Sequence, residues 1–141
     1  MITKVEFKKE HMEYLLQFQT EEYRKAITHE MMTAMEKENM FTGVNAEGEV
    51  MVCGGVRKLW EGRGELWALF NYSKRSYCLS MHKHILNIMN EANLKRIEMV
   101  VYCENTLGHK LAKVLGFKVE TERLTAYRPD GGDVAMYVRI K

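Results

Sequence analysis

Residues 103–120 read CENTLGHKLAKVLGFKVE, and this stretch decides the fold. Asn105 stands where a strand ends, and its side-chain oxygen suits an N-cap because it can accept a hydrogen bond from a backbone N–H of the first helical turn. Leucines and a valine then recur at helical spacing. Gly116 can adopt the left-handed conformation that ends a helix, and Phe117 can begin the next buried strand. The stretch therefore predicts a strand, a short amphipathic helix and a second strand.

The rest of the chain extends this pattern in both directions. Apolar and charged residues alternate at positions 3–7, which predicts a strand at the amino terminus. Two helical patterns follow it, and the second begins at the N-cap residue Thr20 and extends to Met35. We expect three antiparallel strands between 41 and 70, a helix over 77–92, a strand over 96–102, the helix described above, and a hairpin of strands 117–127 and 133–140 joined by RPDGG. Gly54-Gly55 predicts a bulge or a close backbone approach.

The predicted fold class is α/β, in the order β-α-α-β-β-β-α-β-α-β-β. Helices alternate with strands in the second half, which predicts parallel central strands with right-handed crossovers inside a mixed, mostly antiparallel sheet. The 141 residues suit one domain, 1–141, and no stretch rich in Ser, Gly or Pro indicates a linker.

Composition excludes several function classes. The formal charge of +2 argues against nucleic acid as the main partner. A basic patch could still be formed by Arg57, Lys58, Arg63, Lys74, Arg75, Lys95 and Arg96. No apolar run is long enough to span a bilayer. Three cysteines without CxxC spacing favour free thiols and a cytoplasmic location. His82 and His84 point to different sides of a helix, so no metal site is expected, and His11, His29 and His109 are expected at the surface.

The motif NTLGHKLAKVLGF and the order of elements resemble the GNAT superfamily of acyl-CoA-dependent N-acetyltransferases. The resemblance covers nearly the whole chain in topology, and is specific in sequence from about Glu65 to Tyr127. It implies that the strands ELWALF and RIEMVVY splay apart and that acetyl-CoA lies between them. Its pantetheine arm would bind the first strand like an added strand. The implied cofactor contacts are Ala68, Leu69, Phe70 and Asn105.

The same resemblance places the pyrophosphate loop at SKRSYC, which comprises Ser73, Lys74, Arg75, Ser76, Tyr77 and Cys78. The family usually has glycine where this chain has Ser76 and Cys78. A Cβ at those positions hinders close approach of a phosphate, and Lys74 and Arg75 could compensate with charge-assisted contacts. The alternative is a solvated basic turn.

The catalytic residues depart from the family's pattern. Many members carry a tyrosine seven residues after the helix-capping asparagine, and here that residue is Ala112. Tyr102, Tyr127 or a water could protonate the CoA thiolate instead. Glu65 is the candidate general base, because a shielded carboxylate can have a raised pKa; its alternative is an edge residue in solvent. Cys103 is expected to be a buried thiol rather than a nucleophile.

The sequence thus predicts an N-acetyltransferase that uses acetyl-CoA as co-substrate and acts on an unidentified amine, with a homodimer as a further expectation. The alternative belongs to another class. The chain is similar to divergent GNAT-like proteins of tailed bacteriophages, which implies a catalytically degenerate module that accompanies the virion or binds a host protein in the host cytoplasm.

Overall fold

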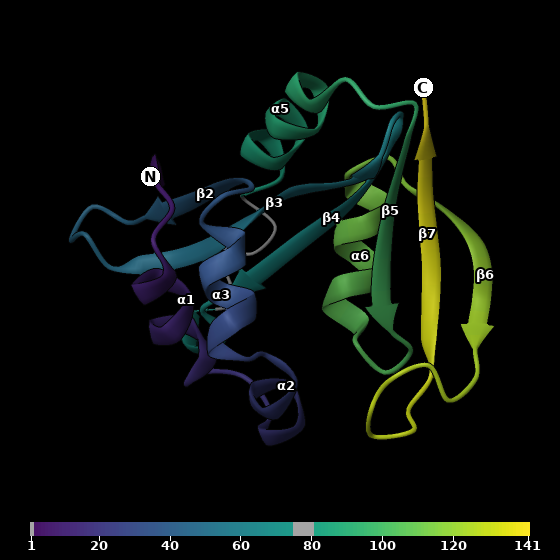
Figure 1. Cartoon of the computed structure of the whole chain (residues 1–141), viewed down its shortest axis with the longest axis horizontal. Coiled ribbons are helices and arrows are strands. Elements are labelled where there is room, and N and C mark those ends of the chain that lie inside the picture. Colours follow the sequence, from purple (N-terminus) through teal and green to yellow (C-terminus); the bar gives the residue numbers. More distant parts are fainter. Residues whose placement is uncertain (1, 75–80) are drawn as a thin grey trace.

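The computed structural model describes residues 2–74 and 81–141 (Figure 1). Its elements, in chain order, are β1 (Thr3–Glu6), α1 (Lys9–Leu16), α2 (Glu21–Ala26), α3 (His29–Met35), β2 (Asn39–Val44), β3 (Val50–Trp60), β4 (Arg63–Phe70), a 3₁₀ turn (Tyr72–Lys74), α5 (His82–Ala92), β5 (Arg96–Tyr102), α6 (Thr106–Val114), β6 (Lys118–Leu124) and β7 (Val134–Ile140). None of the described helices is long and apolar enough to cross a bilayer.

The strands form one seven-stranded mixed sheet in the order β1-β2-β3-β4-β5-β7-β6. β4 and β5 are parallel, and every other neighbouring pair is antiparallel. Figure 1 shows β4 and β5 diverging toward their carboxyl ends. The predicted α/β class with splayed central parallel strands is confirmed.

Two hydrophobic clusters cover the two faces of the sheet. On one face, Leu66 and Phe70 of β4 pack with Ile85 of α5 and Leu111 of α6. On the other face, Leu69 of β4 packs with residues of α1 and α3, and Trp67 is half-buried beside them. Successive side chains of a strand point to opposite faces, so β4 contributes to both cores.

The helical region before β2 differs from the expected order. The sequence predicts one helix from Thr20 to Met35, but the chain makes two, α2 and α3. Ile27 has extended backbone angles, φ −99° and ψ 110°, and Thr28 begins a new helix because its hydroxyl accepts a hydrogen bond of 3.2 Å from the N–H of Met31. A second threonine cap therefore interrupts a continuous helical pattern.

The glycine pair of β3 marks a close backbone approach and not a bulge. The pairing of β3 with both neighbours keeps its register through Gly54 and Gly55. A Cβ atom would lie 2.4 Å from the carbonyl oxygen of Trp67 at Gly54, and 2.2 Å from that of Asn39 at Gly55. Only glycine fits between these strands without displacing backbone.

The stretch at 103–120 folds as its sequence predicts. Asn105 Oδ1 accepts a hydrogen bond of 2.9 Å from the N–H of Gly108 at the start of α6. Gly116 has φ +82°, and Phe117 is buried immediately before β6. The closing hairpin also forms, although β6 ends at Leu124 and not at Tyr127.

Candidate active site

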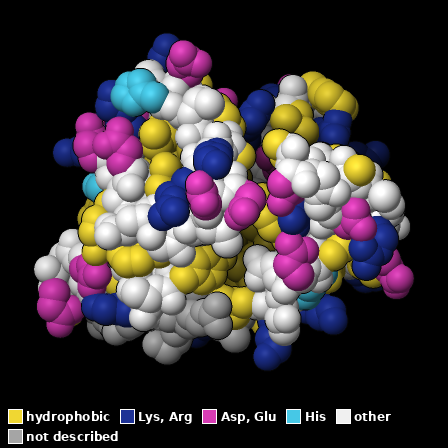
Figure 2. All heavy atoms as spheres, turned by 90° about the horizontal axis from the view of Figure 1, so that it is seen from below, with side chains coloured by type: hydrophobic (Ala, Val, Ile, Leu, Met, Phe, Trp, Pro, Cys, Tyr) yellow, Lys and Arg dark blue, Asp and Glu magenta, His cyan; other side chains and the backbone are white. Residues whose placement is uncertain are grey.

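A cavity opens where β4 and β5 separate. The two strands pair at Arg63–Arg96, Gly64–Ile97 and Glu65–Glu98, and beyond these positions they diverge. The space between them has a volume of about 530 Å³ and is lined by both strands, the α1–α2 connection and the amino-terminal half of α6. Figure 2 shows hydrophobic side chains at the floor of this hollow and acidic side chains on its borders.

The edge of β4 that faces the cavity is set by its pairing with β3. The Asn71 N–H donates a 2.8 Å hydrogen bond to the Met51 carbonyl, and the register is regular from there to Arg57. Along an antiparallel pair of strands, hydrogen-bonded and non-hydrogen-bonded residue pairs alternate. Leu69 lies two residues before Asn71 and therefore directs its N–H and C=O toward Cys53 of β3. The same groups of Ala68 and Phe70 therefore point away from β3, into the opening between the strands, and both residues lie beyond the part of β4 that pairs with β5.

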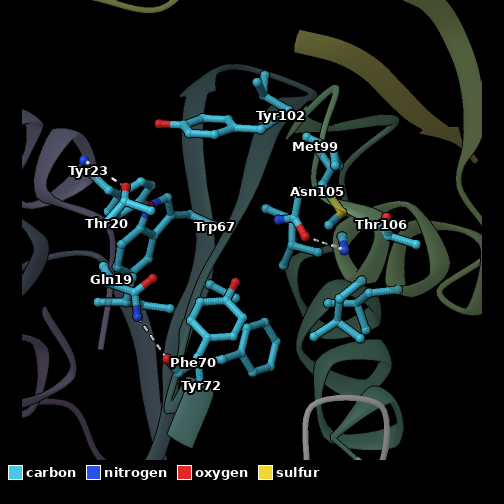
Figure 3. Close-up of a pocket in the computed structure, with 18 of the residues that line it drawn as sticks. Gln19, Thr20, Tyr23, Trp67, Phe70, Tyr72, Met99, Tyr102, Asn105 and Thr106 are labelled. Atoms are coloured by element: carbon cyan, nitrogen blue, oxygen red, sulfur yellow. Dashed lines mark hydrogen bonds between the residues drawn. The ribbon is translucent and has the colours of Figure 1, made fainter. Parts of the chain in front are cut away.

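One of these groups already has a partner from the chain itself. The Phe70 carbonyl accepts a 2.8 Å hydrogen bond from the side-chain amide of Gln19, which also donates to the Leu15 carbonyl at the end of α1. Gln19 thus ties the α1–α2 connection to the free edge of β4 (Figure 3). A ligand that pairs with this strand would find the Phe70 carbonyl occupied.

The closed end of the opening is held by an ion-pair network that the sequence reasoning missed. Glu98 is only 3% exposed. Its carboxylate accepts hydrogen bonds from Arg63 on β4, at 2.8 Å, and from Arg96 on β5, at 2.7 Å. Arg96 also pairs with Glu120 of β6 at 2.9 Å. The network lies at the point where the strands begin to separate. Its only cue in the sequence is a carboxylate within an otherwise apolar strand.

Glu65, the predicted general base, lies at this closed end. Its side chain is half-buried on the sheet face that carries Trp67, and burial raises the pKa of its carboxyl, an effect that Arg57 opposes. Among the described residues, those that line the cavity do not include Glu65. Its partner in the register is Glu98, four residues before Tyr102, so Glu65 and Tyr102 stand about 13 Å apart along the strands. The two residues therefore stand toward opposite ends of the opening.

Tyr102, the predicted acid, lies at the wide end of the cavity. Burial raises the pKa of its hydroxyl, against the effect of Arg128, so the phenol stays protonated at neutral pH. The Arg128 guanidinium stacks 4.0 Å from the Tyr102 ring centre. Tyr127 is 54% exposed, and Ala112 is fully buried in the core. Asn105 lines the cavity while its side chain caps α6.

The predicted pyrophosphate loop is described only in its first part. The Ser73 N–H donates to Asn71 Oδ1 at 3.1 Å. The Lys74 ammonium forms a salt bridge with Glu49, so it would have to leave this carboxylate to reach a phosphate. Arg75, Ser76, Tyr77 and Cys78 lie outside the described residues, and their predicted roles stay predictions.

Two histidines and one cysteine differ from expectation. His11 and His109 are partly buried and hydrogen-bonded and not free at the surface. His109 Nε2 lies 3.0 Å from the Cys103 carbonyl and must donate to it, so Nδ1 of the neutral ring accepts from the Tyr137 hydroxyl at 2.7 Å. Cys103 is partly exposed. In the described parts of the chain no three potential metal ligands cluster together.

The splayed parallel pair, the Asn-capped helix beside it and the closing hairpin match the GNAT fold. Similar solved structures include Ard1 from Thermoplasma volcanium, with 17% identity over 99% of this chain and 97% of that chain and a TM-score of 0.80. A GNAT-family acetyltransferase from Bacillus anthracis is 16% identical over 99% of this chain and 94% of that chain, with a TM-score of 0.70. A spermidine N-acetyltransferase SpeG chimera from Vibrio cholerae and hSSAT is 15% identical over 99% of this chain and 95% of that chain, with a TM-score of 0.75. At these identities the likeness is one of fold. No family model matches the sequence, and no curated protein does.

Proposed function

We propose that the chain is an acyl-CoA-dependent N-acetyltransferase that transfers an acetyl group from acetyl-CoA to an amine. The observation that supports this most strongly is the edge of β4, where the N–H groups of Ala68 and Phe70 face a cavity and not a neighbouring strand. An extended molecule with alternating amide groups can pair with such an edge as an added strand does. The pantetheine arm of CoA has this chemistry.

In the proposed reaction the strand-edge N–H groups near Ala68 bind the thioester oxygen and stabilise the negative charge that develops on it. The neutral amine nitrogen attacks the thioester carbon, a C–N bond forms, and the C–S bond breaks with its electron pair moving to sulfur. The nitrogen loses a proton to Glu65 through a water, and the CoA thiolate takes one from Tyr102 or from water. The products are the N-acetylated amine and free CoA.

The apolar walls of the cavity suit the acyl group, and Ser73 to Cys78 would meet the pyrophosphate, with Arg75 supplying charge. We further propose that the protein works in the cytoplasm, where Cys103 stays a free thiol. We also propose that it assembles as a homodimer. Nucleic acid is not a proposed partner.

A second candidate is a catalytically degenerate GNAT-fold module, of the kind that tailed bacteriophages encode, which binds a host protein or accompanies the virion. Two observations favour it. Ala112 occupies the place of the family's usual tyrosine, and Gln19 occupies a strand-edge carbonyl that a CoA arm would otherwise use.

Calorimetry with acetyl-CoA, followed by a free-thiol assay with a panel of amines, separates the two. The enzyme predicts saturable binding and release of one thiol per acetylated amine. Binding without thiol release for every amine supports the degenerate module, and absence of binding at high micromolar protein contradicts the enzyme.

Glu65→Gln tests the proposed base. A base acts in its deprotonated form, so kcat/KM of the parent should rise with pH as the carboxyl ionises, at a pH above the ordinary range for Glu because burial raises its pKa. We expect the variant to lose about 10²-fold in kcat/KM at neutral pH, together with this rising limb. Glu47→Gln, in an exposed turn, is the matched control and should leave the profile unchanged. If kcat/KM of Glu65→Gln still rises with pH as that of the parent does, another group is the base.

A further inference from the structure

We propose that Tyr23, Trp67 and Tyr102 form an aromatic cage for a positively charged group of the acceptor, separate from the nitrogen that is acetylated. This inference rests on the proposed function and names its substrate class: a diamine-like molecule with a cationic group joined to the reacting amine by an apolar spacer.

The three rings come from three elements and meet at one wall of the cavity. Tyr23 belongs to α2, Trp67 to β4 and Tyr102 to β5, and all three line the cavity. The ring centres of Tyr23 and Tyr102 are 6.1 Å apart, with planes inclined by 52°. In Figure 3 the Tyr102 phenol points across the opening toward Tyr23 and Trp67.

A hydrogen bond within the cage fixes the position of two of its walls. The Trp67 indole N–H donates to the Tyr23 hydroxyl at 3.2 Å. This bond satisfies the only donor of the indole. Both rings line the cavity while they also pack against the hydrophobic cluster around Leu69. Cations are attracted to a ring face within about 6 Å of its centre, and most strongly to that of tryptophan. The cage is therefore preorganised for a cation.

The charges around the cage favour a cation as well. Three carboxylates, Asp130, Glu104 and Glu22, act on Tyr102, and the Arg128 guanidinium opposes them. Arg128 is itself paired with Glu104 at 2.6 Å and with Asp130 at 3.0 Å. Of these four groups three are negative and one is positive, so their sum favours a cation near Tyr102.

Tyr102 already holds one cation in the structure. The Arg128 guanidinium lies 4.0 Å from its ring centre and comes from the β6–β7 connection. Tyr23 and Trp67 belong to α2 and β4, on the other side of the opening between β4 and β5. The ring is thus already used as a cation site, and the same residue lines the cavity that a ligand would enter.

The cage cannot hold the reacting nitrogen in the attacking state, because that nitrogen must be neutral to attack the thioester. A group that stays charged in the cage is therefore a second one. The apolar cavity floor, formed by Leu66, Met99 and Val101, would accept a hydrocarbon spacer between the two.

The cage is tested with choline and its neutral isostere 3,3-dimethylbutan-1-ol, which have the same shape and differ in charge. The chain has two tryptophans, and Trp60 is 60% exposed in the β3–β4 hairpin, so Trp60→Phe leaves Trp67 as the sole indole reporter. In this background we expect choline to change Trp67 fluorescence saturably, with a Kd at least about 10-fold lower than that of the alcohol.

Two variants at one position supply the control. Tyr102→Phe keeps the ring and should leave choline binding within about 3-fold, whereas Tyr102→Leu removes the ring and should weaken it at least about 10-fold. Equal binding of choline and the alcohol, or equal binding by the Phe and Leu variants, would overturn the cage.

A second measurement separates this inference from the proposed function. If the protein binds choline more tightly than the neutral alcohol but does not bind acetyl-CoA, the cage is supported and the transferase is contradicted. Acetyl-CoA binding without discrimination would overturn the cage alone. If both hold, 1,4-diaminobutane should be acetylated with a KM at least about 10-fold lower than 1-aminopentane, which lacks the second charge; equal KM values would contradict the substrate class.

Discussion

Replacing Ala68 with proline should abolish acetyl-CoA binding while the protein remains folded, with Kd rising at least about 100-fold. The Ala68 N–H faces the cavity, so its loss removes no hydrogen bond between β3 and β4. Proline is tolerated in a strand where the N–H is not part of the ladder. The pyrrolidine ring would occupy the space at the strand edge and remove a donor that the ligand needs. Calorimetry with acetyl-CoA gives the measurement, and circular dichroism checks the fold.

The neighbouring position supplies the control. Leu69 directs its N–H toward Cys53 of β3, so Leu69→Pro removes a ladder hydrogen bond in the middle of the sheet and should prevent folding. If Ala68→Pro folds and binds acetyl-CoA like the parent, the free edge of β4 is not the binding site.

Glu98→Ala should cause a large loss of stability. Removing the carboxylate leaves Arg63 and Arg96 close together without their shared counter-charge at the closed end of the strand pair. Breaking a fully buried pair costs about 3–5 kcal/mol, and because both arginines are partly exposed we expect about 2–4 kcal/mol here. Thermal unfolding should move down by roughly 10 °C. The exposed pair of Lys58 and Glu61 is the matched control, and Glu61→Ala should leave the unfolding temperature almost unchanged.

The same network predicts an acid dependence of stability. Hydrogen bonds from Arg63 and Arg96 hold the pKa of Glu98 below its ordinary value. The carboxylate therefore contributes its full stabilisation above the pKa of an unfolded Glu, near 4.3, and loses it as the pH falls through the lower folded-state value. Glu98→Gln should flatten this part of the profile in urea unfolding experiments. If the unfolding free energy of Glu98→Gln falls at low pH as much as that of the parent, other carboxylates cause the acid sensitivity.

The parts of the fold that the sequence predicts are those with local signals. Asn105 and Gly116 bound a helix by their own stereochemistry, and the alternation in β4 and β5 gives the two faces of each strand. The break between α2 and α3 has such a signal in Thr28, but the apolar spacing runs through this residue and predicts one continuous helix. The splay of β4 and β5 came from the resemblance to a known fold and not from periodicity.

The candidate site depends on contacts between residues far apart in sequence, which no local pattern contains. Gln19 meets the Phe70 carbonyl across 51 residues, and Tyr23 meets Trp67 across 44. The strand register decides that Ala68 and Phe70, and not Leu69, present their N–H groups to the cavity. The register also separates Glu65 from Tyr102, although both were candidates by residue type.

Amide hydrogen exchange, measured residue by residue with and without saturating acetyl-CoA, tests most directly whether the cavity-facing edge of β4 binds the cofactor. We expect exchange at Ala68 and Phe70 to slow at least about 10-fold on binding, because the cofactor would pair with these groups. Exchange at Leu69, whose N–H faces Cys53 in both states, should change much less. Equal exchange at Ala68 and Phe70 in the two samples would contradict the account.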